Sequence, residues 1–346
     1  MRIAFVTSAW DAGGGLNGVG TYRCLLPAKA LRSVGHEVCI TPNALANPIT
    51  GELRALDPDG TSIGDIDVIV YVAPPPGNFA DTIWNARLQG QKVVMDCDDW
   101  FVGLELSHPM RKAVLFDADQ HLQAMRKAMT LADMVTFSTS FLADQFPKLR
   151  SKVVVRNMID MSMGWKQRMQ ADIPTIGWTG RIDRRPHDLT MMRGVLGPAI
   201  QTHKLQFCHV GHTLGSMNAA EGFGLDALRV TNVDACPFED YVTKFDFDIG
   251  IVPLANTRFN RSKSWLKRLE YGACAIPSVA SELPEQKALM PWGLARKPID
   301  WRKQLQLMIR PSYRLEKAQE ALDIAWENDI TKRGHEWVMA IESVAS

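Results

Sequence analysis

Lys263 and Glu270 are the two residues whose types and spacing first suggest chemistry. They fall in the stretch from Asp248 to Ser281, where an apolar run, a basic loop and a helical pattern starting near Ser264 follow one another. Seven residues apart on a helix, their side chains would share one face, roughly 10 Å apart along the axis. An anion could rest at the helix start beside the lysine while the glutamate accepts hydrogen bonds from a diol. A nucleotide diphosphate offers that pair of groups.

A simpler interpretation of the same helix stays open. Lys267 precedes Glu270 by three residues, so the two side chains could form a solvated ion pair of small energetic value.

A second group of charges follows a predicted strand at Thr175–Trp178 and the turn residue Gly180. Four potential cations lie there within seven residues: Arg181, Arg184, Arg185 and His187. Arginine can hold phosphate oxygens in a bidentate fork, so this density of cations after a strand suits an anion. The alternative is a solvated, charged loop.

Glycines mark a third candidate, between a strand predicted at Arg2–Thr7 and a helical pattern at Tyr22–Val34. Gly14 and Gly15 belong to this glycine-rich loop. Because glycine lets the backbone approach a ligand closely, the loop could cradle phosphate or sugar groups. It lacks the G-x-G-x-x-G spacing, which argues against a dinucleotide. A flexible turn is the alternative.

Asp96, Asp98 and Asp99 end a strand predicted from Lys92 to Met95. Such a cluster could hydrogen-bond a reacting hydroxyl, act as a base or bind a divalent cation. We favour a role for Asp98 or Asp99 and expect no metal. In the alternative, Asp99 caps a turn and Asp96 is a buried hydrogen-bond acceptor.

Strands and helices alternate throughout the chain, which predicts an α/β protein with parallel sheets. The pattern pauses at Asn157–Ala171 and then restarts, and 346 residues suffice for two cores. We therefore predict an N-terminal domain at 1–160 and a C-terminal domain at 161–324. A last helix at 325–346, with Trp326 and Trp337, would dock back on the first domain.

Composition narrows the class of protein. Basic and acidic residues nearly cancel, 39 against 38, so no global field attracts nucleic acid or membranes. The six cysteines are scattered without a C-x-x-C pair, as in the reduced core of a cytoplasmic protein. The first residues show no signal-peptide pattern, and no apolar run has the ~20 residues of a membrane span. We expect a soluble, cytoplasmic protein and make no prediction of its oligomeric state.

Three motifs in this order resemble those of the GT-B glycosyltransferases, above all the retaining family-4 group (glycosyl transferases group 1) in its bacterial or phage-type variant. They are GVGTYRCLLPAKAL (Gly18–Leu31), IGWTGRIDRRPHDL (Ile176–Leu189) and the stretch from Asp248 to Ser281. The resemblance covers nearly the whole chain. It implies two Rossmann-like domains facing across a cleft, with a C-terminal helix crossing back to the first. The second domain would bind a nucleotide sugar and the first an acceptor.

The resemblance also assigns residues. Glu270 matches the second glutamate of the family's E-x7-E element and would bind the ribose, whereas Ser262 stands where the first glutamate belongs and would contact the donor from there. Arg181 matches the arginine that meets the diphosphate. The remaining donor-binding expectations are Gly180, Gly14 and Gly15 as backbone contacts, Lys263 and Ser264 in place of the first glutamate, and His187, Arg184 or Arg185 in place of a family lysine.

The implied reaction moves a hexose-type sugar from a UDP- or GDP-sugar to an acceptor hydroxyl with retention, without metal or cofactor. Arg181, Lys263, His187 and helix N-termini would stabilise the leaving diphosphate. The acceptor stays open among polysaccharide, lipid, protein and a modified DNA base. Two alternatives share the architecture: a sugar-nucleotide 2-epimerase and a non-catalytic nucleotide-sugar-binding protein.

Overall fold

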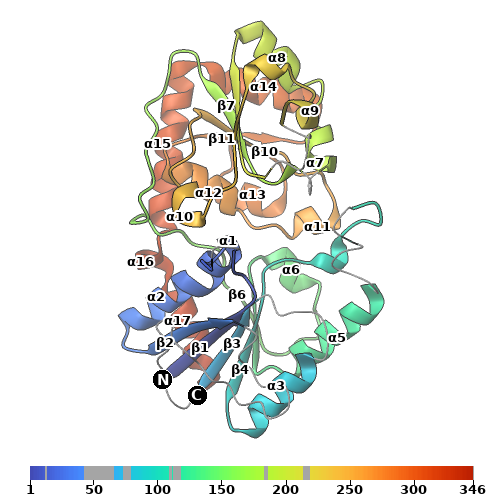
Figure 1. The fold of residues 1–346 in the computed structure, drawn as a ribbon, viewed down its shortest axis with the longest axis vertical. Helices are drawn as coiled ribbons and strands as arrows, with labels where there is room; N and C mark the ends of the chain where they lie inside the picture. The colour runs from blue at the N-terminus through green and yellow to red at the C-terminus, as the bar shows by residue number, and fades with distance from the viewer. Residues whose placement is uncertain are drawn as a thin grey trace. The chain divides into compact units, whose positions relative to one another are not determined.

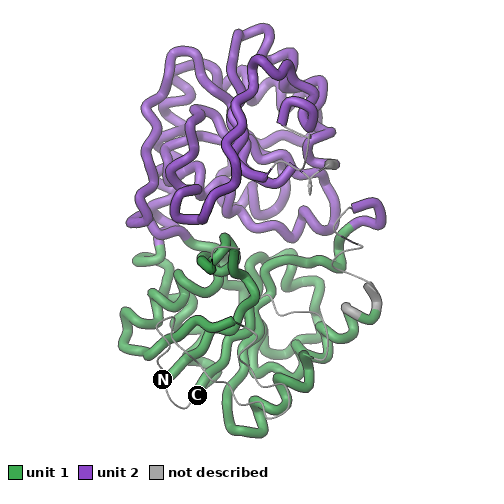
Figure 2. Tube along the Cα trace, in the orientation of Figure 1, with its two compact units in different colours: residues 1–104, 113–158, 330–346 green, residues 105–112, 159–329 purple. Residues whose placement is uncertain are grey.

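The computed structural model describes residues 1–11, 14–42, 66–72, 79–108, 111, 118–182, 186–212 and 219–345. The chain divides into two compact units (Figure 2). Unit 1 comprises Met1–Leu104, Ala113–Met158 and Ile330–Ser346, and unit 2 comprises Glu105–Lys112 and Ile159–Asp329. The end of the chain thus belongs to unit 1, as does its beginning. A short segment from the first half of the chain, Glu105–Lys112, belongs to unit 2.

Unit 1 is built on a six-stranded parallel sheet with the order β2-β1-β3-β4-β5-β6. Its strands are β1 (Arg2–Thr7), β2 (Glu37–Pro42), β3 (Val68–Val72), β4 (Lys92–Cys97), β5 (Met134–Phe137) and β6 (Lys152–Val154). The central strands are continuous apolar runs because both faces of a parallel sheet are covered by helices. The strands predicted at Arg2–Thr7 and from Lys92 to Met95 are therefore confirmed as β1 and β4.

Helices cover both faces of this sheet (Figure 1). They are α1 (Gly18–Gly20), the π-helix η1 (Thr21–Leu25), α2 (Leu26–Ser33), α3 (Phe79–Leu88), the 3-10 helix η3 (Phe101–Gly103), α5 (Ala118–Leu131), α6 (Ser140–Asp144), α16 (Ile330–Arg333) and α17 (His335–Ala345). The first helical segment begins at Gly18 rather than at Tyr22, because Asn17 caps it by accepting from two backbone N–H groups. Trp337 of α17 packs edge-on against Phe5 of β1, so the predicted return of the chain's end to the first domain is confirmed. The predicted docking of Trp326 is wrong, because the return begins at Ile330 and Trp326 lies in unit 2 with 46% of its surface exposed.

Unit 2 repeats the plan, with a six-stranded parallel sheet in the order β12-β11-β10-β7-β8-β9. Its strands are β7 (Thr175–Thr179), β8 (Gln206–Val210), β9 (Val230–Val233), β10 (Ile249–Val252), β11 (Ser278–Ser281) and β12 (Leu294–Ala295). The chain runs from β7 outward to β9 and then returns to place β10 on the other side of β7. The boundary between β7 and β10 is thus the topological switch point, where open parallel sheets bind ligands at the carboxyl ends of their strands.

Two groups of helices cover the two faces of the unit 2 sheet. One apolar cluster joins the sheet to α12 (Leu266–Ala273), α13 (Pro284–Leu289) and α15 (Pro311–Glu327). The other joins it to α7 (Pro186–Thr190), α8 (Leu196–His203), α9 (Ala219–Phe223) and α14 (Pro298–Ile309). Three short helices, η5 (Ala227–Arg229), α10 (Phe238–Tyr241) and α11 (Arg258–Arg261), lie in loops. Turns from Met191 to Val195 separate α7 from α8.

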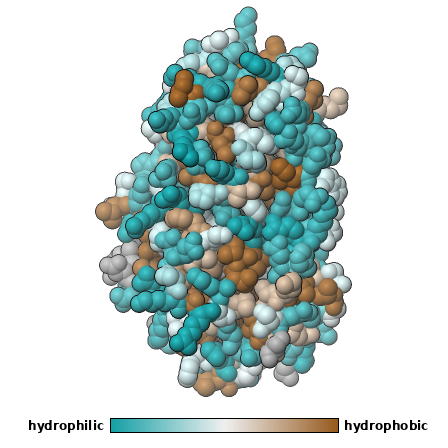
Figure 3. Space-filling model, turned by 180° about the vertical axis from the view of Figure 1, so that it is seen from behind, coloured by the Kyte–Doolittle hydropathy of each residue, from teal (hydrophilic) through white to brown (hydrophobic). Residues whose placement is uncertain are grey.

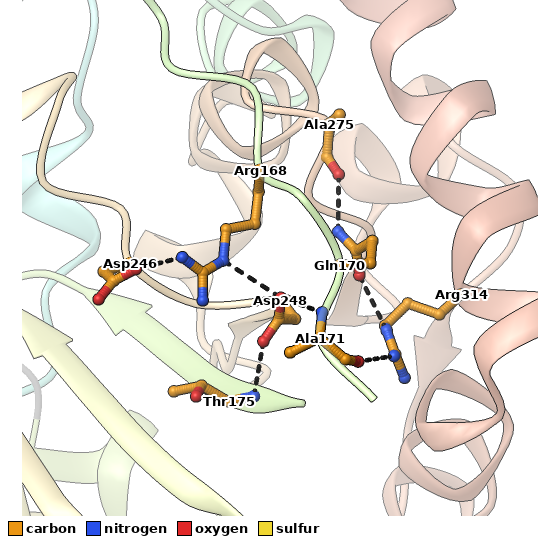
Figure 4. Close-up of polar contacts among 8 residues, drawn as sticks. All are labelled: Arg168, Gln170, Ala171, Thr175, Asp246, Asp248, Ala275 and Arg314. Carbon is orange, nitrogen blue, oxygen red and sulfur yellow. Dashed lines mark hydrogen bonds and ion pairs between the residues drawn. The ribbon is translucent and has the colours of Figure 1, made fainter. Parts of the chain in front are cut away.

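The segment that leads into β7 is fastened to unit 2 (Figure 4). Arg168 pairs with Asp246 and Asp248, and Asp248 also accepts from the backbone N–H of Thr175 at 2.8 Å. Arg314 of α15 donates to the Gln170 side chain at 2.8 Å. Asp248 and Arg314 are 0% and 1% exposed. These charged side chains fix the start of β7 relative to β10. The turn at the other end of β7 is thereby fixed as well.

The surface, the cysteines and the helix lengths can be compared with what the composition suggested. On the face seen in Figure 3, hydrophilic side chains predominate and hydrophobic ones form small separate groups. All six cysteines are free thiols, five of them buried, and burial raises the pKa of Cys274 to about 12. Within the ranges that the structure describes, every helix is too short or too polar to cross a bilayer.

Candidate functional site

The turn after β7 is shaped by two glycines and a histidine. Gly180 has a φ of +152°, and its carbonyl lies against Gly211, where an added Cβ would meet it at 2.1 Å. His209 is fully buried, and its Nε2 lies 2.9 Å from the Gly180 carbonyl. Burial lowers the pKa of His209, so the neutral ring donates to that carbonyl through Nε2. The turn delivers Arg181, half-buried, to the carboxyl end of β7.

His209 therefore has a structural role in this turn. Its ring stacks on Trp178 with centroids 5.3 Å apart. The predicted role of Gly180 as a backbone contact for a ligand stays a prediction. What the structure adds is the reason for a glycine there, since an added Cβ would lie 2.8 Å from the Trp178 ring.

The loop after β10 contains a short helix that the sequence analysis missed. Thr257 caps α11 by accepting from the backbone N–H of Asn260 at 3.1 Å. The Asn260 side chain donates to the buried carboxylate of Asp188 at 2.7 Å, and Asp188 also accepts from the backbone N–H of Ala255 at 2.7 Å. Asp188 belongs to α7, so it ties the loop after β10 to the helix after β7. The two sides of the switch point are thus held together.

Lys263 does not occupy the helical position that its spacing suggested. Helix α12 begins at Leu266, and Lys263 lies in the turn between α11 and α12. The predicted shared helix face of Lys263 and Glu270 is therefore wrong. The Lys263 ammonium lies 4.4 Å from the centroid of the Phe259 ring, in a cation–π contact.

The two serines next to Lys263 differ in exposure. Ser262 is fully buried, and its hydroxyl donates to the Phe259 carbonyl at 2.6 Å. A side chain with no exposed surface is a poor contact for a sugar, so we assign Ser262 no part in binding. Ser264 is half-buried and accepts from Gln286 through its carbonyl at 3.0 Å. Its contact with a donor stays a prediction.

Glu270 is a buried carboxylate near the middle of α12, only 6% exposed. Its Oε2 accepts from the Tyr241 hydroxyl at 3.2 Å. Burial, together with the charge of Glu270, raises the pKa of Tyr241 well above its usual value, so the phenol stays a donor. This burial contradicts the alternative of a solvated surface ion pair with Lys267.

Packing of the next residue explains why α12 sits where it does. The Tyr271 ring lies on β10 at Gly250, where an added Cβ would be 2.3 Å from the ring. Its hydroxyl accepts from the backbone N–H of Thr179 at 3.0 Å. The helix that carries Glu270 is therefore bonded to the end of β7, next to Gly180 and Arg181.

Lys267 is the residue that the sequence analysis undervalued. Its ammonium donates to the carbonyl and, at 2.9 Å, to the hydroxyl of Thr179, and it lies 5.7 Å from the Trp178 ring centroid. The signal was present, because Lys263 and Lys267 are four residues apart beside a predicted strand end. Lys267 brings a cation to the end of β7, immediately before Arg181.

A shallow hollow, open to solvent, lies among the loops that follow β7 and β10. We call it the unit 2 hollow. It is lined by Glu105, His108, His187, Asp188, Thr257, Phe259 and Asn260. The half-exposed imidazole of His187 lies 3.2 Å from the Ser107 hydroxyl and 3.6 Å from the Glu105 carboxylate, both through Nε2. The predicted cations Arg184 and Arg185 fall outside the described residues.

In unit 1 the glycine loop follows β1 as predicted. Gly14 has a φ of +83°, which favours glycine, and an added Cβ would meet nothing within 4 Å. Gly15 donates its N–H to the Asp11 carboxylate at 2.9 Å and accepts from the Asp11 N–H at 2.8 Å. Both glycines are exposed, so their backbone is open to a ligand. Contact with a donor stays a prediction.

The acids at the end of β4 separate into two environments. Asp96 is 1% exposed and pairs with Arg23 through two hydrogen bonds, of 3.0 Å and 2.5 Å. It has the structural role given by the simpler interpretation. Asp98 and Asp99 are half-buried, and their carbonyls accept from Ser138 and Cys97. Within the described ranges, no group of three metal-binding side chains gathers here or elsewhere.

The structure therefore brings Arg181, Lys263, Lys267, His187 and Glu270 to one edge of unit 2. These residues come from the loops after β7 and β10 and from the helix that follows. Gly14, Gly15, Asp98 and Asp99 lie at the carboxyl ends of β1 and β4 in unit 1.

Comparison with known proteins shows the fold. No family model and no curated protein matches the sequence. Among solved structures, HepE from Anabaena in complex with UDP and glucose matches with a TM-score of 0.66 and 14% identity, over 99% of this chain and 100% of that one. A glycosyltransferase from Rickettsia africae matches at 0.67 and 10% identity, over 99% and 98%. An α-glucosyltransferase in complex with UDP matches at 0.59 and 12% identity, over 99% and 100%. With its two parallel six-stranded sheets, the chain has the GT-B fold of these glycosyltransferases.

Proposed function

We propose that this protein is a glycosyltransferase that moves a hexose-type sugar from a nucleotide diphosphate sugar to an acceptor hydroxyl. The observation that carries the proposal is the match of the whole chain to glycosyltransferases solved with UDP. The residues at the switch point of unit 2 support it, because they combine a buried carboxylate with several cations. Unit 2 binds the donor, a UDP- or GDP-sugar, and unit 1 binds the acceptor. As in the retaining family-4 enzymes that the motifs resemble, the configuration at the anomeric carbon is retained.

Glu270 binds the ribose in this proposal. A carboxylate has two oxygens, and each can accept from a ribose hydroxyl. The Tyr241 hydroxyl holds Oε2 at 3.2 Å, so the carboxylate is oriented before a ligand arrives. Preorganisation of this kind reduces the entropy lost on binding.

Arg181 and Lys263, with Lys267 behind them, hold the diphosphate. Arg181 follows the rigid Gly180 turn, and Lys267 is fixed to Thr179 at the end of the same strand. When the bond between the anomeric carbon and the diphosphate oxygen breaks, the leaving group takes the electron pair. Fixed cations stabilise that charge more in the transition state than in the ground state.

The acceptor hydroxyl attacks the anomeric carbon from the face that the diphosphate leaves. Its oxygen forms the new glycosidic bond, and its proton passes to the departing phosphate oxygen, so no enzyme nucleophile is required. Asp98 and Asp99 are the unit 1 carboxylates that we assign to orienting this hydroxyl. No metal or cofactor enters this proposal.

A thermal-shift panel of UDP-, GDP-, TDP- and ADP-sugars tests donor binding, since a ligand that binds only the folded state raises the melting temperature. We expect one nucleotide series to stabilise the protein, by about 2.7 kcal/mol at a hundredfold excess over Kd. The shift should be lost in Glu270→Ala and Arg181→Ala. No shift with any series would contradict the proposal.

Product analysis then separates the reaction classes. Incubation of the stabilising donor without acceptor should give slow release of free sugar, and a transfer product should form when acceptors are added. The acceptors should include hydroxymethylated DNA, because one α-glucosyltransferase of this fold was solved with a 13-mer DNA. Conversion of the donor into its epimer without acceptor would instead identify an epimerase. Binding without hydrolysis, epimerisation or transfer would identify a binding protein.

A further inference from the structure

The unit 2 hollow has no assigned ligand in the account so far. It is formed by α7 after β7, by α11 after β10 and by the segment at residues 105–108. The last of these reaches unit 2 from the first half of the chain. Two residues from this segment, Glu105 and His108, line the hollow. The Glu105 carboxylate and the His108 imidazole therefore lie near the switch point, although residues 105–108 belong to none of the three motifs that resemble glycosyltransferases.

The lining favours a neutral polyol over an anion. Glu105 offers carboxylate oxygens, and its side chain is 44% exposed. Among the described residues that line the hollow there is no lysine or arginine, and the carboxylates would repel a phosphate. Imidazole, carboxylate and hydroxyl groups can exchange hydrogen bonds with sugar hydroxyls.

Asn260 adds one defined acceptor to this lining. Its Nδ2 donates to Asp188 at 2.7 Å and to the Ala255 carbonyl at 3.0 Å, which uses both amide protons. What the side chain can still offer a ligand is therefore its carbonyl oxygen, Oδ1. Because Asp188 is 3% exposed and also bonded to the Ala255 N–H, the amide is held in this orientation.

The hollow also adjoins the cations of the proposed diphosphate site. Phe259 lines it and carries the Lys263 ammonium 4.4 Å from its ring centroid. A donor whose diphosphate lies at Lys263 would therefore have its sugar next to the hollow. Ser262, at the position where the enzymes that the motifs resemble would carry a glutamate, is fully buried and cannot contact that sugar.

We propose that the unit 2 hollow binds the transferred sugar, a neutral hexopyranose, and that Glu105 supplies the carboxylate missing at position 262. This inference rests on the proposed function and deepens it by naming the sugar subsite. Glu105 accepts hydrogen bonds from two adjacent sugar hydroxyls, and Asn260 accepts from a third. His187, beside Glu105, belongs to this subsite rather than to the diphosphate site.

The test compares a nucleotide with its sugar conjugates in the full chain. Isothermal titration measures Kd for UDP, UDP-glucose, UDP-galactose and UDP-N-acetylglucosamine, and for GDP and GDP-mannose. In the wild type, we expect one sugar conjugate to bind more tightly than its parent nucleotide. In Glu105→Gln, the affinity for that conjugate should fall about tenfold or more, as for loss of hydrogen bonds to a charged group, with the affinity for UDP or GDP unchanged.

A matched control is Glu316→Gln, which removes an exposed carboxylate from α15, on another side of unit 2 (Figure 1). It should change neither affinity. Glu105→Asp, which keeps the charge, should recover part of the lost sugar affinity. If UDP or GDP binds and Glu105→Gln leaves every ratio of conjugate to nucleotide unchanged, the sugar subsite is wrong while the proposed function stands. If no nucleotide or conjugate binds the wild type, the proposed function fails and the subsite with it.

Discussion

Both units have a buried carboxylate near the carboxyl end of the sheet, and Asp96 of unit 1 differs from Glu270 of unit 2 in its partners. Asp96 in unit 1 is 1% exposed and meets the fully buried guanidinium of Arg23. Thr136 also donates to it, at 2.5 Å. Glu270 in unit 2 is 6% exposed and accepts from a neutral phenol, that of Tyr241.

Burial alone therefore does not identify a binding residue. Arg23 also bonds the Val155 carbonyl and the Asn157 side chain and lies 4.7 Å from the Trp337 ring centroid. Its network joins β4, the chain after β6 and the last helix, so Asp96 serves the fold of unit 1. Glu270 lies beside the end of β7, where cations gather, so we assign it to a ligand. Variants can test this distinction, because changes around Asp96 should alter stability and changes around Glu270 should alter ligand binding.

The largest expected effect is that of Asp96→Asn. Removing this charge leaves the Arg23 guanidinium buried and uncompensated, which should lower the free energy of unfolding by about 3–5 kcal/mol. Urea denaturation followed by circular dichroism measures it. The control is Asp81→Asn, because Asp81 is exposed and lies 3.9 Å from Lys127, where a pair contributes about 0–1 kcal/mol. If Asp96→Asn lowers the free energy of unfolding no more than the control does, the structural role assigned to Asp96 is wrong.

A smaller effect, on binding rather than stability, is expected for Lys267→Met. The substitution keeps the apolar stem beside Trp178 but removes the ammonium at Thr179. We expect nucleotide diphosphate affinity to fall about tenfold, with a change in stability of about 1 kcal/mol. Lys303→Met, on the exposed face of α14, is the control. Unchanged affinity in Lys267→Met would show that this cation serves only to hold the end of β7.

The smallest expected effect concerns the partner of Glu270. Tyr241→Phe should cost about 1 kcal/mol at pH 7, the typical net contribution of one hydrogen bond. Above pH 10 the difference in the free energy of unfolding between the wild type and the variant should become smaller. The folded state keeps the Tyr241 proton because its pKa is raised by burial and by Glu270, whereas the unfolded state loses its proton there.

The wild type therefore loses stability as pH rises above 10, by up to about 1.4 kcal/mol per pH unit from this group. The Phe variant lacks that contribution, so its stability should fall less steeply between pH 10 and 11. Guanidinium titrations at pH 7, 10 and 11 provide the measurement. Parallel slopes for the two proteins would mean that Tyr241 titrates normally in the fold.

The sequence predicted most strands because continuous apolar runs mark buried parallel strands. It missed β9, since Val230–Val233 lies at the edge of its sheet and is partly exposed, which leaves no apolar run. It misplaced the start of α12, because Thr257 and Asn260 form a cap that ends the basic loop in a separate helix. A closer look at the T-x-x-N spacing would have predicted that cap.

The candidate site was predictable where a motif is local and not where the fold joins distant residues. Glu270 and Arg181 stand in motifs beside strand ends, so their neighbourhood could be predicted. The pairing of Asp96 with Arg23 spans 73 residues, and local patterns say nothing about it. Glu105 lies 82 residues before His187 in the chain, without an adjacent motif, so its place in the unit 2 hollow required the structure.

The most direct test of the account is the affinity of UDP and GDP for Glu270→Gln, measured by isothermal titration beside the wild type. Glutamine keeps the size of the side chain and loses only its charge. The account predicts that one of the two nucleotides binds the wild type and that its affinity falls at least about tenfold in the variant, while the melting temperature without ligand stays close to that of the wild type. Equal nucleotide affinity in two equally stable proteins would contradict it.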